Sequence, residues 1–501
     1  MQENLKQFKE YLAEISDLGA ATALIAWDQE TYMPPGAVGD RSMQLATLNR
    51  IIHDKFTSDE IGDLIEKLKP ELSSLDPDSD DACLIKSVSR EYEKQRKVPS
   101  DWVAEFSRAT SIAQEAWKKA RQKSEFALFQ PDLANVLELR RQYAQYFAPY
   151  DHIYDPLLDD FEPGMKTADV ERVFTELRPK QVQLVQKIMD SNHPIDDSIL
   201  HQEFDEQKQW DFGIEVIKAF GFDLNRGRQD KSTHPFTTSF GNNDVRLTTR
   251  LASNFLSIGL FGTLHEAGHG MYEQGISPNL SRTPLADGAS LSIHESQSRM
   301  WENLVGRSRS FWIGFYPRLQ EYFPSQLGEV DLENFYRAIN KVERSLIRTE
   351  ADEATYNLHI MLRFELELAL IQQQLDLADL PDVWNTKMQE YLGITPPNDA
   401  DGVLQDIHWS FGIFGYFSTY CLGNLVAGMF WEKILSDIPD LETQFERGKF
   451  EALWNWLHEN VLQHGAKFEP ADLIKRITGT ELTAEPYMQY LTNKFGDIYH
   501  L

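Results

Sequence analysis

Apolar side chains recur at helical spacing through most of this chain, and this periodicity limits the possible folds more than any other feature. One helical face near the start carries Leu5, Phe8, Tyr11, Leu12 and Ile15. A similar stripe runs from Val170 to Leu177, and Pro179 is expected to interrupt it. Residues 329–380 contain no Gly and no Pro, which predicts one long helix or two closely joined helices. The chain is therefore predicted to be mainly α-helical.

Strand signals are few by comparison. The best is HPFTTSF at residues 234–240, followed by a Gly-Asn-Asn turn and DVRLTTR at residues 244–250, which together predict a β-hairpin. No internal repeat, low-complexity tract or flexible linker divides the sequence. Residues 1–501 are expected to form one large unit, with two lobes as the simplest subdivision.

The charge balance excludes several classes of partner. The net charge is −29, so phosphate backbones and anionic membranes would be repelled, and nucleic acid is not expected as a partner. No run of eighteen apolar residues predicts a membrane span, and the N-terminal residues lack a secretory pattern, so the prediction is a cytoplasmic protein. Cys83 and Cys421 are too few for a disulfide framework or a cysteine metal site, and both are expected to be buried.

A His-Glu-x-x-His motif is the strongest chemical signal. His265 and His269 are four residues apart, so on a helix both imidazoles lie on one face and can bind one ion. Glu266 lies at the edge of that face, where it can reach an attacking water without being a ligand. A metzincin would have Gly at position 272 and His at position 275, but this chain has Tyr272 and Gly275, which excludes that subclass.

Glycine positions around the motif carry two further predictions. Gly262 and Thr263 are a possible helix break and N-cap just before the histidines. Gly268 and Gly270 weaken a helix, and their lack of a side chain makes room for another group to approach the backbone.

A catalytic zinc needs a third protein ligand and one open position. Residues 289–306 form a good amphipathic helix pattern, and Glu295 in that segment follows His269 by 26 residues, enough for a loop and a return. We therefore predict Glu295 as the third ligand. Glu302 is the competing carboxylate and His294 the competing imidazole. Zinc is the expected metal, one per chain, and cobalt is expected to be able to substitute.

Several motifs together resemble the carboxypeptidase Taq family of metallocarboxypeptidases. His-Glu-Ala-Gly-His followed by His294-Glu295-Ser296 carries the resemblance first. The other motifs, in chain order, are WDQETYMPPGAVGDRSMQ at 27–44, YDPLLDDFEPGM at 154–165, Asp244, Arg246 and Thr248, then Ile347, Arg348, Ala351 and Asp352, then Gly402, Gln405, Asp406, His408 and Trp409. Two positions depart from the family pattern: Phe161 stands where Tyr is expected, and Ser418 where Pro is usual.

The resemblance implies a saddle-like, mainly helical fold similar to neurolysin and angiotensin-converting enzyme, with a deep groove and the metal at its base. It also implies a homodimer that removes single C-terminal residues from peptides with broad specificity. Only the metal site can be inferred from spacing, whereas the exopeptidase activity comes from the resemblance.

Residue roles follow from the chemistry of peptide hydrolysis. Glu266 is predicted to take a proton from the attacking water and pass it to the leaving amine. Tyr416 is the first choice as hydrogen-bond donor to the oxyanion and Tyr420 the second, by comparison with a tyrosine in related zinc peptidases. Both tyrosines could instead pack in an aromatic core.

A carboxypeptidase must also bind a free carboxylate, which a guanidinium does best because it donates two parallel hydrogen bonds. Arg348 is the leading candidate, although Arg348 and Asp352 could simply pair on a helix. Arg246, on the predicted hairpin, is the second candidate, and an edge strand there could pair with substrate backbone.

The Gln-Asp-x-His segment supplies the remaining candidates. His408 is predicted to donate to a substrate carbonyl or steady the intermediate, although a His beside Trp is often a satisfied core residue. Gln405 and Asp406 are predicted to orient His408 or close one end of the groove.

Two other functions stay open at this point. One is an endopeptidase or dipeptide-releasing carboxypeptidase on the same scaffold. The other is a metal-stabilised helical binding protein without turnover, against which an intact Glu266 argues because a closed structural site has no use for it.

Overall fold

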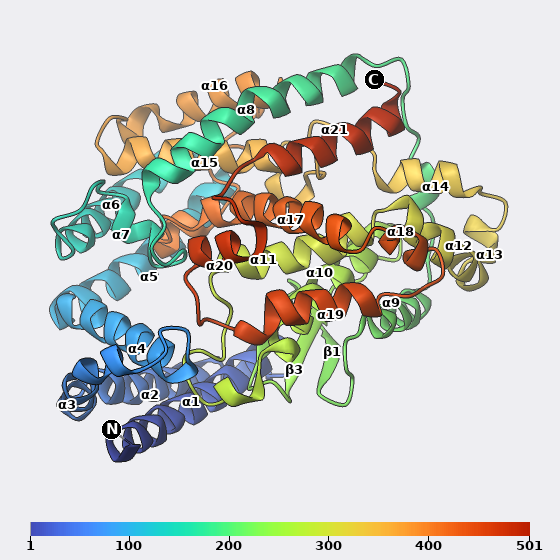
Figure 1. Cartoon of the computed structure of the whole chain (residues 1–501). Coiled ribbons are helices and arrows are strands. Elements are labelled where there is room, and N and C mark those ends of the chain that lie inside the picture. Colours follow the sequence, from blue (N-terminus) through green and yellow to red (C-terminus); the bar gives the residue numbers. More distant parts are fainter. Residues whose placement is uncertain (1) are drawn as a thin grey trace.

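Helices form nearly all of the regular structure, as the apolar periodicity predicts. The computed structural model describes residues 2–501 (Figure 1). The helices before the sheet are α1 (Gln2–Thr31), α2 (Val38–Phe56), α3 (Asp59–Leu68), α4 (Asp80–Lys97), α5 (Ser100–Lys123), α6 (Gln130–Gln145), α7 (Asp155–Leu158), α8 (Thr167–Asp190) and α9 (Glu206–Phe220). Those after the sheet are α10 (Leu256–Gly275), α11 (Leu291–Arg299), α12 (Arg309–Tyr322), α13 (Pro324–Leu327), α14 (Leu332–Ile339), α15 (Tyr356–Ile371), α16 (Leu380–Leu392), α17 (Phe417–Asp437), α18 (Leu441–Phe445), α19 (Glu451–Asn460), α20 (Pro470–Thr478) and α21 (Glu485–Tyr499).

The one sheet in residues 2–501 has three strands in the order β1-β3-β2. Strands β2 (Thr237–Ser239) and β3 (Val245–Thr249) are antiparallel, which confirms the predicted hairpin. Strand β1 (Gly227–Lys231) runs parallel to β3 and was not predicted, because its Gly-Arg-Gln-Asp-Lys sequence has no apolar alternation. Strand β2 is left at an edge of the sheet, where its outer backbone groups are free of strand partners.

Helices α10, α11 and α17 occupy the centre of the molecule (Figure 1). Glycines let α11 approach its neighbours closely on both sides. A Cβ at Gly268 of α10 would lie 2.6 Å from the Gln297 carbonyl oxygen and from Ser298 Cα, and a Cβ at Gly423 of α17 would lie 2.7 Å from Glu295 Cβ. The prediction that Gly268 makes room for another group is therefore confirmed, and that group is the backbone of α11.

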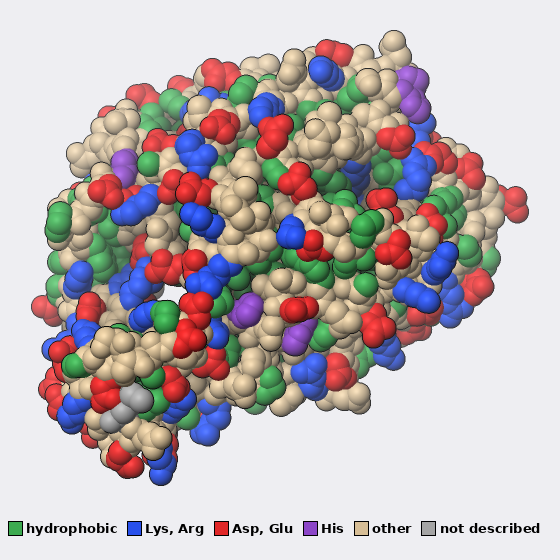
Figure 2. Space-filling model, in the orientation of Figure 1, with side chains coloured by type: hydrophobic (Ala, Val, Ile, Leu, Met, Phe, Trp, Pro, Cys, Tyr) green, Lys and Arg blue, Asp and Glu red, His purple; other side chains and the backbone are tan. Residues whose placement is uncertain are grey.

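The N-terminal helices α1–α4 lie together at the lower left of Figure 1. The space-filling view of the same face is hollowed between these helices and the rest of the molecule, with charged side chains around the hollow (Figure 2). Trp27 of α1 is buried and packs under the guanidinium of Arg246, 4.4 Å from the ring centroid, so α1 is attached to the sheet. Cys83 and Cys421 are both buried and unpaired, as expected.

None of the helices in residues 2–501 combines the length and the apolarity that crossing a membrane requires.

Three local predictions were wrong. Pro179 lies inside α8, because buried side chains on both sides of it hold the helix together against the roughly 3 kcal/mol that an internal proline costs. Gly262 and Thr263 do not begin a helix: α10 starts at Leu256, and Thr263 Oγ1 is hydrogen-bonded to Thr249 Oγ1 instead of capping.

The segment 329–380 is not one long helix or a close pair. Helix α14 ends at Ile339 and α15 begins at Tyr356, with irregular backbone between them. Asp352 stabilises this irregular segment, because its carboxylate accepts hydrogen bonds from the backbone N–H groups of Glu343, Ala354 and Thr355. These side-chain bonds replace the backbone bonds that a helix would make.

The close approach at Gly268 gives a test of the central packing. Gly268→Ala should lower stability by about 1–3 kcal/mol, because the added methyl group meets the backbone of α11 and not a movable side chain. Gly262→Ala on the same helix is the matched control, since nothing lies within 4 Å of its Cβ position. That control should be neutral or more stable by about 0.5–1 kcal/mol, the helix-propensity gain. Calorimetry on the two variants checks this, and equal effects of the two substitutions would contradict the packing.

Candidate metal centre and its groove

Three side chains bring one ligand atom each to a common point. His265 and His269 extend from α10 and Glu295 from α11, and their ligand atoms all lie within 4.8 Å of one another. Glu295 Oε2 is 3.7 Å from His265 Nε2 and 3.5 Å from His269 Nε2. Two neutral imidazoles and a carboxylate with an open fourth position fit a catalytic divalent metal. The predicted set is thus brought together, and in residues 2–501 it is the one such group.

Glu302, the competing carboxylate, supports His265 instead of joining the ligand set. Its Oε2 lies 2.9 Å from His265 Nδ1, so that ring nitrogen carries the proton and Nε2 is left with a free lone pair. Burial disfavours charge on His265, but the carboxylates of Glu295 and Glu302 outweigh it and raise the pKa of this imidazole. Glu302 lies in the π-helical turn Met300–Val305 that continues α11.

His294, the competing imidazole, supports the second ligand in the same way. Its Nδ1 lies 2.6 Å from His269 Nδ1, and its Nε2 lies 2.8 Å from Glu273 Oε1. With both imidazoles neutral, one assignment of protons satisfies all three groups: His269 donates from Nδ1 to His294 Nδ1, and His294 donates from Nε2 to the Glu273 carboxylate. That assignment again leaves His269 Nε2 free toward Glu295, so the chain of three side chains orients a ligand.

Arg299 holds the carboxylate ligand. Its Nε donates to Glu295 Oε1 at 2.7 Å, and its Nη1 donates to Glu302 Oε2 at 3.2 Å, so one guanidinium fixes the ligand and the partner of His265 together. Burial opposes ionisation of Glu295, yet Arg299 and the neighbouring imidazoles lower its pKa well below the usual range. Glu295 is therefore a carboxylate at neutral pH. Arg299 was not singled out from the sequence, although its i, i+4 spacing from Glu295 is the pattern of such a pair.

Glu266 lies beside this group without entering it. Thr237 Oγ1, on the edge strand β2, donates to Glu266 Oε2 at 2.7 Å. Burial raises the pKa of Glu266, which suits a group that must take up and release a proton. Thr237 was not singled out from the sequence, because one hydroxyl in a polar hairpin gives no distinguishing pattern.

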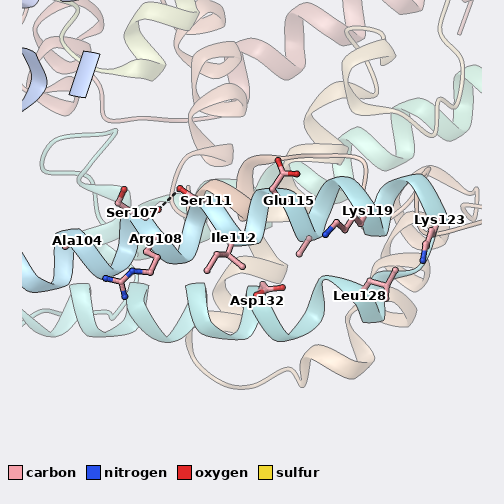
Figure 3. Close-up of a pocket in the computed structure, with 11 residues that line it drawn as sticks. Ala104, Ser107, Arg108, Ser111, Ile112, Glu115, Lys119, Lys123, Leu128 and Asp132 are labelled. Atoms are coloured by element: carbon pink, nitrogen blue, oxygen red, sulfur yellow. Dashed lines mark hydrogen bonds between the residues drawn. The ribbon is translucent and has the colours of Figure 1, made fainter. Parts of the chain in front are cut away.

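The metal group opens into a cavity of about 650 Å³. Its walls come from α1, β2, α10, α11 and α17, and include Ser16, Thr237, Thr238, Ser239, Tyr416 and Tyr420. The edge strand β2 thus runs along the cavity, as the prediction of a substrate-pairing strand requires. A second depression of about 810 Å³ lies on the outer surface of α5 and α6 (Figure 3). Its lining, which includes Ser107, Ile112 and Leu128, contains none of the three candidate metal ligands.

Tyr416 and Tyr420 lie at the start of α17, with their hydroxyl groups 3.4 Å apart. Phe161, one of the two departures from the family pattern, packs edge-on against Tyr416 at 5.2 Å between ring centroids. Ser418, the other departure, donates to the carbonyl of Gly415 and is buried in the first turn of α17. Both departures therefore lie around the predicted oxyanion donor and leave the metal ligands untouched.

Arg348 is nearly buried next to Tyr420, 5.2 Å from its ring centroid. It does not pair with Asp352 on a helix, because residues 348–350 form a single 3-10 turn. Its Nε and Nη2 instead donate to Asp406 Oδ1 at 3.0 and 2.9 Å, and Nη1 donates to the hydroxyl of Tyr356 at 3.1 Å. Gln405 fixes the local backbone by accepting from the Arg348 N–H at 2.9 Å.

His408 is not among the residues that line the cavity. The His408 ring packs against Tyr416 and Phe417 at 5.5 and 4.5 Å between centroids, and burial lowers its pKa to about 4, so it is neutral at pH 7. Arg246 does not line the cavity. Its guanidinium is bonded to Asp244 at 2.9 and 3.0 Å and stacks on Trp27.

Known proteins match this chain over nearly its full length in both sequence and structure. Residues 7–495 match the carboxypeptidase Taq (M32) metallopeptidase family. The chain belongs to this family. It is 42% identical to thermostable carboxypeptidase 1 of Thermus thermophilus, over 99% of this chain and 98% of that protein, and 40% identical to carboxypeptidase 1 of Bacillus subtilis, over 99% of both. The crystal structure of the M32 carboxypeptidase from Deinococcus radiodurans R1 superposes with a TM-score of 0.97 at 40% identity, covering 100% of both chains.

Membership of the M32 family fixes the class of reaction. The protein is a carboxypeptidase, a hydrolase that acts on peptide ends and depends on a metal. The His265, His269 and Glu295 group is consistent with the site of such an enzyme. The mainly helical fold and the family resemblance, both predicted from the sequence, are confirmed.

The charge pair behind His265 gives a test of the M32 metal site. Glu302→Gln should weaken metal binding by about 10–100-fold, because the neutral amide no longer fixes the tautomer and orientation of the imidazole. Glu390→Gln, on the exposed face of α16, is the control and should bind metal as the parent does. Equilibrium dialysis against a metal buffer measures both, and unchanged affinity of the Glu302 variant would remove Glu302 from the site.

Proposed function

We propose that this carboxypeptidase uses one zinc ion, bound by His265, His269 and Glu295, to release single amino acids from the C-termini of peptides. The observation that carries the proposal is the convergence of the two Nε2 atoms and one carboxylate oxygen beside a separately held glutamate. A zinc ion bound there supplies a Lewis acid that acidifies water and polarises the scissile carbonyl. Cobalt, with similar ligand preferences, is expected to substitute.

Glu266 is proposed as the general base. Its buried carboxyl has a raised pKa, and the hydrogen bond from Thr237 holds Oε2 in one orientation. Glu266 would take a proton from the attacking water and deliver it to the leaving amine. The Thr237 bond supports this role, since a base must keep its geometry through both transfers.

Tyr416 is proposed to donate its hydroxyl hydrogen to the oxyanion, with Tyr420 next to it as the alternative donor. Both line the cavity that contains the metal group. Burial raises the pKa of Tyr416, so the hydroxyl keeps its proton and remains a donor at neutral pH. His408, neutral and packed on Tyr416, is proposed to hold that ring and to face the substrate backbone.

Arg348 is proposed to bind the C-terminal carboxylate of the substrate. Three of its five N–H groups are used by Asp406 and Tyr356, which leaves two for an incoming carboxylate. Tyr356 also connects Arg348 to the metal centre. The guanidinium of Arg299, which holds Glu295, lies 4.5 Å from the centroid of the Tyr356 ring. Gln405 and Asp406 orient the guanidinium. Arg246, hydrogen-bonded to Asp244 and stacked on Trp27, is proposed to hold α1, which lines the cavity, against the sheet.

The domain, assembly and location remain predictions. Residues 1–501 are proposed to act as one catalytic unit with two lobes, and a homodimer and a cytoplasmic location are expected. Peptides with a free C-terminus are the proposed partners, without nucleic acid or membrane.

Replacing the base tests the mechanism. Glu266→Gln should lower kcat by about 10²–10⁴-fold, because the amide cannot accept a proton, while the metal content stays at one per chain. Mass spectrometry of metal-loaded protein and a peptidase assay measure the two quantities. Near-normal turnover by this variant would refute the role of Glu266.

Matched substrates test the exopeptidase proposal. A free-acid peptide should lose one residue at a time, and its C-terminal amide should stay intact. Arg348→Met should raise KM for the free acid by about 10–100-fold, the value of a hydrogen bond to a charged group. Product masses over time check both results. Internal cuts would indicate an endopeptidase, and an unchanged KM would move the carboxylate site away from Arg348.

A further inference from the structure

Asp406 is shared between two arginines. Its Oδ1 accepts from Arg348, as described above, and its Oδ2 accepts from Arg363 Nε at 2.7 Å and forms an ion pair with Arg363 Nη2 at 2.5 Å. Arg363 extends from α15 and is completely buried, with Nη1 donating to the carbonyl of His359 at 2.7 Å. The guanidinium also lies 4.7 Å from the ring centroid of Trp384. Nothing in the sequence motifs pointed to Arg363.

The charges of this cluster do not cancel. Two guanidinium groups and one carboxylate give a net charge of +1, because the arginines keep their protons and Arg363 and Arg348 lower the pKa of Asp406 despite its burial. The two nearby imidazoles add no charge at pH 7: burial lowers the pKa of His408 to about 4 and that of His359 well below its usual range. A buried excess charge is costly unless something neutralises it.

We propose that Arg363 is a positioning residue that sets the preference for a free C-terminal carboxylate by neutralising Asp406, so that Arg348 keeps its charge available for the substrate. This inference rests on the proposed role of Arg348 as the carboxylate-binding residue. Binding of a substrate carboxylate completes the cluster and brings its net charge to zero. Without Arg363, Asp406 would neutralise Arg348 directly, and an incoming carboxylate would leave a buried negative charge.

A structural role alone does not require Arg363. Asp406 and Gln405 already fix Arg348 through its side chain and its backbone N–H. A second, fully buried cation adds a desolvation cost that an Arg348–Asp406 pair would avoid. The cluster lies directly behind the wall of the metal cavity, because the Arg348 guanidinium is 5.2 Å from the ring centroid of Tyr420, which lines that cavity. The surplus charge is therefore next to the cavity in which the substrate is proposed to bind.

The test compares variants that change the charge balance in opposite directions. Arg363→Met gives a cluster of zero net charge, and Arg363→Met with Asp406→Asn returns it to +1. Arg363→Lys keeps the charge at +1 with one residue changed. Arg178→Met is the matched control. Arg178 lies on α8, where it pairs with Glu365 of α15, the helix that carries Arg363, and hydrogen-bonds to Tyr391, without contact to Asp406. Each zinc-loaded protein is assayed on one N-blocked free-acid peptide, and inhibition by N-acetylphenylalanine is compared with inhibition by its amide.

Arg363→Met should raise two quantities about 10–100-fold: KM for the free-acid peptide and the inhibition constant of N-acetylphenylalanine. The kcat and the inhibition constant of N-acetylphenylalanine amide should change much less. The double variant and Arg363→Lys should each recover most of that loss, and Arg178→Met should match the parent. If the double variant binds the carboxylate as poorly as Arg363→Met, charge balance is not the cause and the proposal fails. Equal weakening of the acid and the amide would likewise overturn it, because that pattern marks structural damage.

The outcome for Arg348 separates the two proposals. If Arg348→Met leaves KM unchanged, the carboxylate site itself is misassigned. If Arg348→Met raises KM but Arg363→Met does not, the carboxylate site stands and the role of Arg363 is refuted. If Arg363→Met folds poorly, Arg363→Lys and the double variant take its place in this comparison. The proposal then requires both of them to bind the free acid nearly as the parent does.

Discussion

The contact between α10 and α11 at Gly268 is the constraint on which the site depends. Two histidines on one helix can present their Nε2 atoms to an ion, but a third ligand must come from a helix close enough to reach the same point. The missing side chain at Gly268 lets the backbone of α11 approach α10, and the missing side chain at Gly423 lets α17 pack against Glu295 from the other side. Any side chain at these positions would displace the carboxylate from the histidines.

Electrostatics then determines how each ligand is presented. Glu302 accepts a hydrogen bond from Nδ1–H of His265, and His294, itself bonded to Glu273, accepts one from Nδ1–H of His269. Both Nε2 lone pairs are therefore free on the side of Glu295. Arg299 keeps Glu295 ionised despite its burial. These contacts are made inside the fold, where an unpaired charge would be costly, and each carboxylate therefore has a cation or an N–H donor.

The features that could be predicted from the sequence are those that produce a periodic or regularly spaced pattern of residues. Helical stripes, the hairpin and the His-Glu-x-x-His spacing are local, and so they were predictable. Arg363 and Thr237 act on residues far away in the chain, Asp406 and Glu266, and one sequence carries no sign of such contacts. The irregular segment after Ile339 was missed for a related reason: the hydrogen bonds of Asp352 outweigh a composition that favours a helix.

An anomalous difference map at the zinc edge, from crystals of zinc-loaded protein, locates the metal and identifies its ligands. One strong peak per chain is expected, about 2.0–2.2 Å from His265 Nε2, His269 Nε2 and a carboxylate oxygen of Glu295. A peak bound by His294 or Glu302 in place of one of these ligands would refute the proposed metal site, as would a Glu295 side chain turned away from the metal.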